Sequence, residues 1–197
     1  MTVDVVTSPA GSHRQDRDDV ALAVPARSSV PCMGKANYLV EGLSGTGKTT
    51  VADELARRGL QAIHGDRALA YPGDALTGEP FETSGRDDHI WDVAKVRTLV
   101  ADRRQDVTFF CGGSRNFPQF LDLFDAVFVL EVDLPTLHQR LDARPDDEWR
   151  DGIATDRALI TRWHATRETV PAGIAVDATA PIERVVDGIL ARCGIDA

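Results

Sequence analysis

Residues 42–49 read Gly42-Leu43-Ser44-Gly45-Thr46-Gly47-Lys48-Thr49, which fits the pattern G-x-x-x-x-G-K-[S/T] at every fixed position. In this pattern the glycines let the backbone curl, so that successive N–H groups point at phosphate oxygens. The lysine reaches the β- and γ-phosphates of a nucleotide, and the threonine hydroxyl can hold Mg²⁺. The sequence therefore predicts a site for ATP and Mg²⁺. The nucleotide is expected to contact Gly42, Ser44, Gly45, Thr46, Gly47, Lys48, Thr49 and Thr50.

The residues on both sides of this loop have the patterns that a phosphate-binding loop requires. Residues 37–40 form a short run typical of a buried strand. Residues 50–58 carry apolar side chains at a spacing that predicts an amphipathic helix, and Gly59 is placed to end it. Strand, loop and helix in this order distinguish the motif from a chance glycine-rich turn.

The rest of the chain alternates between predicted strands and helices. The expected strands are residues 60–64, 107–111, 126–132 and 174–177, and the expected helices are residues 89–100, 117–123, 135–141, 153–169 and 181–192. This alternation is typical of an α/β protein with a parallel sheet. We therefore expect a three-layer P-loop NTPase fold, with a parallel sheet of about five strands, helices on both faces and a small lid.

Composition narrows the class of protein. The chain has 197 residues, enough for one domain with its own core, and a formal net charge of −9, which argues against a nucleic-acid partner. No apolar run approaches the length of a membrane span, so no membrane partner is expected. Three widely separated cysteines predict reduced thiols in a cytoplasmic protein. Residues 1–36, rich in charge and proline, are expected to be a disordered leader ahead of a domain at residues 37–197.

Features outside the loop narrow the class further. No Asp stands three residues before a Gly, and no Asn-Lys-x-Asp run occurs, so two recognition elements of GTPases are missing. The strand expected at residues 107–111 ends in Gly112-Gly113, where a typical Walker B strand ends in an Asp that helps to hold Mg²⁺. Instead, Asp66 follows the strand expected at residues 60–64. Arg140 and Arg144 lie four residues apart, on one face if their helix persists.

In these features residues 37–193 resemble the small P-loop kinases, the group of shikimate kinase, gluconate kinase and the nucleoside monophosphate kinases. Gly65-Asp66 matches the position at which shikimate and gluconate kinases carry an Asp that faces the acceptor hydroxyl. Gly112-Gly113 is similar to the glycine-rich substrate contact of shikimate kinase. Residues 133–145 are similar to the entry into an arginine-bearing lid, and residues 176–181 to the loop near adenine.

The resemblance implies transfer of the γ-phosphoryl group of MgATP to a hydroxyl of a small metabolite. The catalytic residues would be Lys48, Asp66, Arg140 and Arg144, with Thr49 and Asp66 as metal ligands. The acceptor would contact Asp66, Arg86, Gly112, Gly113 and Arg115. The acceptor-binding segment is expected at about residues 66–104 and the lid at about residues 143–153. Such kinases often act as monomers, so a monomer is favoured while the oligomeric state is left open.

Each assignment has a structural alternative. Asp66 could cap a helix, the four arginines could be surface residues, and Trp91 is expected in the core or the pocket wall. His64 stands where shikimate kinase usually has a second Asp, and its role is left open. For the whole chain the alternatives are a nucleoside or nucleoside monophosphate kinase, and a regulatory nucleotide-binding protein with little turnover. The sequence does not identify the acceptor.

Overall fold

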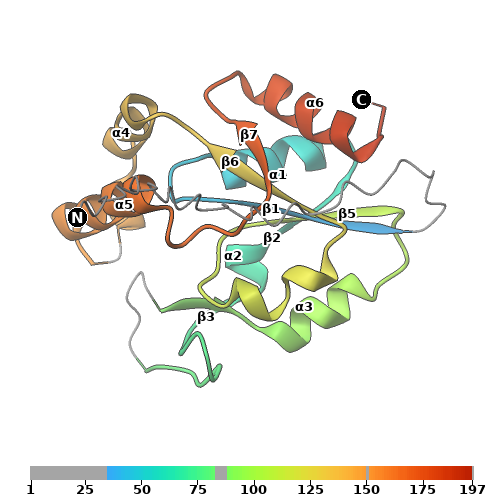
Figure 1. Ribbon diagram of the computed structural model, residues 1–197, viewed down its shortest axis with the longest axis horizontal. Coiled ribbons are helices and arrows are strands. Elements are labelled where there is room, and N and C mark those ends of the chain that lie inside the picture. Colours follow the sequence, from blue (N-terminus) through green and yellow to red (C-terminus); the bar gives the residue numbers. More distant parts are fainter. Residues whose placement is uncertain (1–34, 83–87, 150, 197) are drawn as a thin grey trace, which may run out of the picture. The chain divides into compact units, whose positions relative to one another are not determined.

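A five-stranded parallel sheet forms the centre of the part of the chain that the computed structural model describes, namely residues 35–82, 88–149 and 151–196 (Figure 1). The strands are β1 (Ala36–Gly42), β2 (Gln61–His64), β5 (Val107–Cys111), β6 (Ala126–Glu131) and β7 (Ile174–Asp177). Their order in the sheet is β2-β5-β1-β6-β7. The α/β fold with about five parallel strands, predicted from the sequence, is confirmed.

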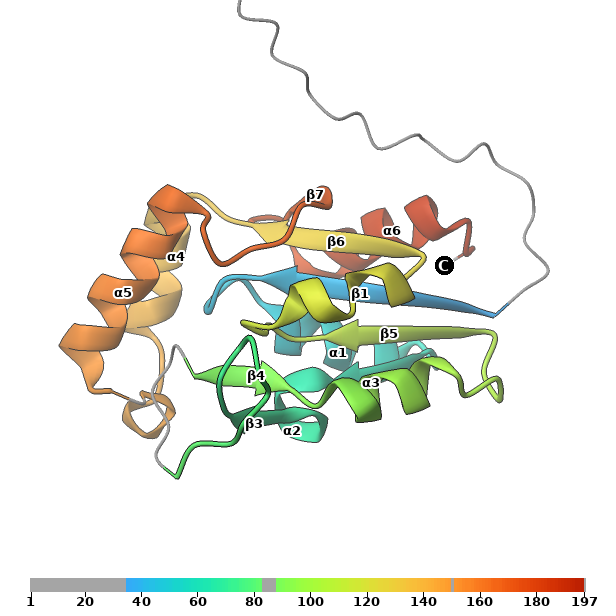
Figure 2. The ribbon, with the colours of Figure 1, turned by 60° about the horizontal axis from the view of Figure 1, so that its bottom comes forward.

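Helices cover both faces of this sheet. Helices α1 (Lys48–Arg57) and α6 (Ile182–Cys193) lie together on one face, and α3 (Val93–Val100) lies on the other (Figure 1). Figure 2 shows α4 (Leu134–Asp142) and α5 (Ile153–Thr166) at the end to which the strand arrows point. In a parallel α/β sheet this is the end where ligands bind.

Successive residues of each strand supply the two layers of the core. Val40 and Phe109 pack in the cluster that includes residues of α1 and α6, whereas their neighbours Leu39 and Phe110 pack in the cluster on the α3 side. This follows from the two-residue period of a strand, which sends adjacent side chains to opposite faces. Because both faces are covered, the strands are apolar along most of their length.

The prediction of a helix over residues 89–100 is wrong at its start. His89–Trp91 is a short strand, β4, which pairs antiparallel with β3 (Ala70–Pro72), and the helix begins only at Val93. Asp92 marks the boundary, because its side chain accepts a hydrogen bond from the Lys95 N–H and caps α3. The helix-like spacing of the apolar residues continues through the strand, so the sequence pattern alone does not reveal the change.

Smaller differences concern the connecting segments. The single short helix expected at residues 117–123 is two 3₁₀ turns, η1 (Phe117–Gln119) and η2 (Leu121–Leu123). A four-residue helix, α2 (Gly65–Ala68), follows β2, and a 3₁₀ turn, η3 (Asp146–Glu148), lies in the segment expected to be the lid. In the part of the chain that the structure describes, no helix combines the length and the apolar character needed to cross a membrane.

Candidate active site

The phosphate-binding loop joins β1 to α1 through glycines with backbone angles that other residues rarely adopt. The φ angles of Gly42, Gly45 and Gly47 are 152°, 93° and 103°. A side chain at Gly42 would also place its Cβ 2.8 Å from the carbonyl oxygen of Leu130, so the loop passes the end of β6 only without one. The loop leads into the N-terminus of α1, where backbone N–H groups and the helix dipole favour an anion.

Two side chains of the loop hydrogen-bond its own backbone. Thr46 closes the turn, because its N–H and its hydroxyl both donate to the Leu43 carbonyl, at 3.1 and 2.8 Å. The Lys48 Nζ donates to the carbonyls of Gly42 and Leu43, at 2.5 and 3.0 Å. An ammonium group has three N–H donors, so Lys48 lies across the loop with a third donor for a phosphate oxygen.

A cavity of about 730 Å³ opens beside this loop. Its polar part is lined by residues 44–50 together with Asp66, Arg140 and Arg144, and its apolar part by the segment after β7 and the start of α6. The apolar lining residues are Ala178, Ala180, Ile182 and Val185, with Val51 from α1. The volume lies within the range of about 300–1,000 Å³ typical of small-molecule sites. A cationic end and an apolar end suit the phosphates and the base of a nucleotide.

Arg140, in the last turn of α4, ties the loop to the segment after β7. Its guanidinium donates to the carbonyls of Thr46, at 2.9 Å, and Ala178, at 2.7 Å, with a longer contact of 3.4 Å to the Gly45 carbonyl. Through these contacts the charged guanidinium of Arg140 stabilises the curled conformation of the loop. Catalytic contact between Arg140 and a transferred phosphoryl group stays a prediction.

Arg144, just beyond the end of α4, reaches the phosphate-binding loop. Its guanidinium donates to the Ser44 hydroxyl at 2.9 Å and lies 5.0 Å from the centre of the Trp149 ring. The same side chain is within 3.8 Å of the Glu148 carboxylate. Both arginines singled out in the sequence therefore line the larger cavity, although α4 ends at Asp142 and does not persist to Arg144.

Asp66 places a carboxylate at the ends of two adjacent strands. It is the second residue of α2, directly after β2, and its Oδ1 accepts a hydrogen bond from the Gly113 N–H at 3.0 Å. The same Oδ1 lies 3.3 Å from the His89 Nε2. The alternative that Asp66 caps a helix is wrong, because the N-cap of α2 is His64. The carboxylate thus reaches the end of β5, where the sequence itself supplies only glycines.

Two glycines bring Asp66 to this position by packing against a buried indole. Trp91 is 1% exposed and stacks on Phe120 with a ring separation of 5.4 Å. A Cβ at Gly65 would lie 2.1 Å from the Trp91 ring, and one at Gly112 would lie 2.6 Å from both that ring and the Asp66 Oδ1. Trp91 is therefore a core residue beneath the site, and Gly112 acts as the spacer between it and the carboxylate.

The charge state of Asp66 follows from these neighbours. Burial raises the pKa of its carboxyl, but the His89 hydrogen bond, the Lys48 charge and the Gly113 N–H together lower it further, so the net pKa is below its ordinary value. Asp66 is therefore ionised at neutral pH. An ionised carboxylate can accept a hydrogen bond from a hydroxyl or ligate a cation.

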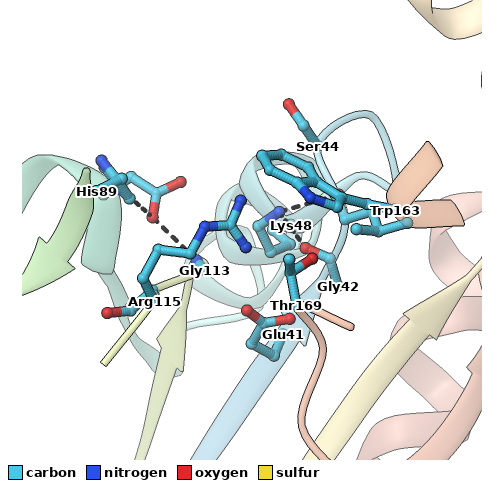
Figure 3. A pocket seen from close by; sticks show the side chains of 12 residues that line it. Glu41, Gly42, Ser44, Lys48, His89, Gly113, Arg115, Trp163 and Thr169 are labelled. Carbon is cyan, nitrogen blue, oxygen red and sulfur yellow. Dashed lines mark hydrogen bonds and ion pairs between the residues drawn. The ribbon is translucent and has the colours of Figure 1, made fainter. Parts of the chain in front are cut away.

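A second, smaller cavity of about 110 Å³ is also lined by Lys48 and Asp66 (Figure 3). It is lined by the end of β1, by the loop after β5, and by two residues of the α5 region, Trp163 and Thr169. Ser44, Lys48 and Asp66 line both cavities. The two spaces therefore meet at an ammonium group and a carboxylate.

The loop after β5 is fixed against β4 by a set of short contacts. The Arg115 N–H donates to the His89 carbonyl at 2.9 Å, and the Trp91 N–H donates to the Asn116 Oδ1 at 2.9 Å. The Arg115 guanidinium lies 3.9 Å from the centre of the Trp163 ring, in a cation–π arrangement that links this loop to α5. Figure 3 shows the guanidinium projecting into the space between Lys48, Glu41 and Trp163.

Glu41, which the sequence reading did not single out, lies at the base of the smaller cavity. It is the penultimate residue of β1 and is 3% exposed. Burial raises the pKa of its carboxyl to about 7, against the lowering effect of the Lys48 and Arg115 charges and the Gly42 backbone and with a further rise from Asp66. A charged residue inside an otherwise buried strand is a signal that could have identified it.

The other residues considered in the sequence analysis lie in different places. Thr49 and Thr50 line the larger cavity, and Gly113 and Arg115 line the smaller one. Arg86 lies outside the described residues. His64, left open from the sequence, has its Nε2 3.2 Å from the Asp53 carboxylate of α1 and is absent from the residues described as lining either cavity.

Comparison with solved structures shows that the chain shares the fold of several kinases of known structure. A sugar kinase from Janibacter sp. HTCC2649 matches with a TM-score of 0.52 and 20% identity, over 82% of this chain and 95% of that chain. A gluconokinase from Sinorhizobium meliloti 1021 matches with a TM-score of 0.51 and 23% identity, over 79% of this chain and 90% of that chain. A shikimate kinase from Bacteroides thetaiotaomicron matches with a TM-score of 0.50 and 15% identity, over 81% of this chain and 99% of that chain. These likenesses confirm the fold expected from the sequence.

The family follows from the sequence comparison. Residues 39–159, more than half of the chain, match the AAA domain family, and the chain belongs to that family. The match spans the phosphate-binding loop, the segment around Asp66, and both Arg140 and Arg144. No curated protein matches the chain.

Proposed function

We propose that the protein is a kinase that transfers the γ-phosphoryl group of MgATP to a hydroxyl of a small metabolite. The observation that carries the proposal is the meeting of the two cavities at Lys48 and Asp66. The larger cavity has the size and polarity for ATP, and the smaller one has room for a small acceptor. A phosphoryl group bound at the loop would lie near the Asp66 carboxylate, and that carboxylate could hold the hydroxyl of an acceptor in the smaller cavity.

On the donor side, the chain supplies positive charge and N–H donors. The loop amides and Lys48 bind the β- and γ-phosphates. Arg144, which contacts Ser44 of the loop, is near enough to donate hydrogen bonds to the γ-phosphoryl group during its transfer. Phosphoryl transfer depends mostly on positioning and charge neutralisation, so these contacts are the main catalytic contribution. Arg140 acts chiefly by holding the loop in shape through the Thr46 and Ala178 carbonyls.

The residues present fit a magnesium ion. The Thr49 hydroxyl and the Asp66 carboxylate line the same cavity, and both are oxygen donors of the kind Mg²⁺ prefers. Mg²⁺ usually takes only one or two protein ligands and completes its shell with water and phosphate oxygens. When bound, it would neutralise charge on the β- and γ-phosphates.

On the acceptor side, Asp66 holds and orients the reacting hydroxyl. The acceptor oxygen bonds to the γ-phosphorus as the bond to the β,γ-bridging oxygen breaks, and ADP leaves with that oxygen. The acceptor proton passes to the Asp66 carboxylate and then to solvent. Because the Asp66 pKa is lowered, the group acts mainly by orienting the hydroxyl, with modest strength as a base.

The size of the smaller cavity favours a small acceptor over a nucleoside. A volume of about 110 Å³ is well below that of typical drug-sized sites, and the indole that lines it, Trp163, already stacks with the Arg115 guanidinium. A nucleoside or nucleoside monophosphate acceptor is therefore the weaker alternative.

The proposed location of the enzyme is the cytoplasm. ATP as the phosphoryl donor and the free thiol of the buried Cys111 are both consistent with it.

The test is an assay of ADP release from the full chain with MgATP and a panel of polyols, sugar acids, shikimate, nucleosides and nucleoside monophosphates. Stimulation by an acceptor is expected, and Lys48→Ala should lower turnover by roughly 10²-fold or more, since it removes a preorganised charge. Lys95→Ala, at an exposed position of α3, is the matched control and should retain activity. ATP binding without stimulation by any acceptor would refute the proposal and favour a regulatory nucleotide-binding protein.

A further inference from the structure

Two polar side chains of the smaller cavity have atoms that face it without a hydrogen-bond partner. The Glu41 Oε2 and the Thr169 Oγ1 are both buried, and neither has a partner among the described residues. Both side chains line the same small cavity, as the close-up in Figure 3 shows. Buried polar atoms in proteins are nearly always hydrogen-bonded, so two such atoms in one cavity point to a ligand that completes them.

The charges around Glu41 limit what that ligand can be. Two cations, Lys48 and Arg115, and two carboxyl groups, Glu41 itself and Asp66, surround this point. Neither a cationic nor an anionic group therefore gains a net attraction from them. A neutral hydroxyl needs none, because it donates to a carboxylate oxygen and accepts from a threonine hydroxyl.

The same cavity contains a second place for a hydroxyl. Asp66 lines it on the His89 side, and the proposed reaction occurs there. At about 10–15 Å³ for each water-sized group, a volume of about 110 Å³ accommodates roughly ten non-hydrogen atoms. This is the size of a short polyol or a small sugar, which carries several hydroxyls.

We propose that Glu41 and Thr169 form an anchoring site for a second, non-reacting hydroxyl of the acceptor, so that the enzyme selects polyhydroxylated acceptors over those with a single hydroxyl. The inference rests on the proposed kinase function and assigns the substrate class. Glu41 and Thr169 are specificity residues in this scheme, and Asp66 remains the residue at the reacting hydroxyl.

The experiment compares pairs of acceptors that differ by one hydroxyl, such as a four- or five-carbon polyol and its deoxy analogue. In the unmodified chain, kcat/KM should favour the polyol by about 10- to 100-fold, as expected for a hydrogen bond to a charged group. Thr169→Val, which keeps the side-chain shape, and Glu41→Leu, which removes the acceptor oxygens, should each reduce that preference, mainly through KM for the polyol. Thr98→Val and Glu183→Gln, at exposed positions of α3 and α6, are the matched controls.

A binding measurement separates this inference from the proposed reaction. Calorimetric titration of the polyol into the ADP-bound protein reports anchoring without turnover, and the affinity should fall about 10-fold or more in Thr169→Val and Glu41→Leu. Binding that depends on these residues, without ADP release, would support the anchor and refute the kinase reaction. Equal kcat/KM for both members of each acceptor pair, or an unchanged preference in both variants, would overturn the anchor while the kinase proposal stands. Absence of both binding and turnover would overturn both.

Discussion

The strongest quantitative prediction concerns the pH dependence of stability and the buried carboxyl of Glu41. Its pKa rises from the ordinary value of 4.5 to about 7 on folding, so between these values the folded state binds more protons than the unfolded state. Under that condition the free energy of unfolding falls as pH rises. The penalty is absent below about pH 4.5 and complete above about pH 7. Glu41→Gln, which cannot ionise, should remove it.

The size of the effect follows from the shift. A change from 4.5 to about 7, at about 1.4 kcal/mol for each pH unit, corresponds to a cost of about 3 kcal/mol for ionising Glu41 in the folded protein. The surrounding core and, to a lesser extent, the negative charge of Asp66 raise this pKa, whereas the positive charges of Lys48 and Arg115 and the Gly42 backbone lower it. At pH 8 we therefore expect Glu41→Gln to be more stable than the unmodified chain by up to about 3 kcal/mol, with most of the gain lost by pH 5.

Urea unfolding, followed by tryptophan fluorescence at intervals from pH 5 to pH 8.5, measures this difference directly. Subtracting the curves of the two proteins cancels other titrating groups. Glu54→Gln is the matched control, because hydrogen bonds from Arg57 and Arg58 lower the Glu54 pKa to about 2. Stability from that carboxylate is lost only as pH falls below its ordinary value toward 2, so its difference curve should be flat across this range.

The shape of the difference curve decides the outcome. A Glu41→Gln curve that is as flat as that of the control would show that the carboxyl is already ionised throughout. The same flat curve is expected if Lys48 and Arg115 outweigh burial, because a lowered pKa places the whole transition below pH 4.5. A flat curve would therefore refute the reasoning about the base of the smaller cavity.

Three further predictions test the neighbouring residues. Asp66→Asn should lower kcat by about 10²-fold or more with a smaller change in KM for ATP, as ADP-release kinetics can show; unchanged kcat would remove Asp66 from the reaction. Gly112→Ala should cost about 1–3 kcal/mol in urea unfolding, because its Cβ would lie 2.6 Å from the Asp66 Oδ1, whereas Gly188→Ala in α6 should be neutral or stabilising. Arg140→Gln should weaken ATP binding and destabilise the fold by about 1–3 kcal/mol, since its guanidinium donates to backbone carbonyls of the loop; calorimetry that finds normal ATP affinity would contradict this.

Local patterns were sufficient to predict the sheet. The strands at Val107–Cys111 and Ile174–Asp177 begin and end where the sequence placed them, because both are short apolar or β-branched runs between turn residues. The strand at His89–Trp91 was missed for the opposite reason. It exists because it pairs with Ala70–Pro72, about twenty residues away, and that contact overrides an apolar spacing that continues into α3.

The site was predictable to the extent that a motif encodes it. The loop residues and Asp66 come together because the motif and the end of β2 lie at the same edge of the sheet. The partners of Asp66 could not be predicted, because His89 reaches it through the β3–β4 hairpin and the Gly113 N–H through the pairing of β2 with β5. Neither contact has a counterpart in local sequence.

The two carboxyl groups beside Lys48 have opposite environments, which suggests how a site without a Walker B aspartate divides its tasks. The pKa of Asp66 is lowered by a histidine, an ammonium group and an N–H donor, so this carboxylate keeps its charge and can serve both a metal ion and a hydroxyl. The pKa of Glu41 is raised by burial to about 7, so this carboxyl is the less readily ionised of the two. Groups whose environments push their pKa values apart take different roles in one site. Asp66 would therefore serve the reaction and Glu41 would serve recognition, and the separate effects of the two substitutions on kcat and on acceptor preference should follow that division.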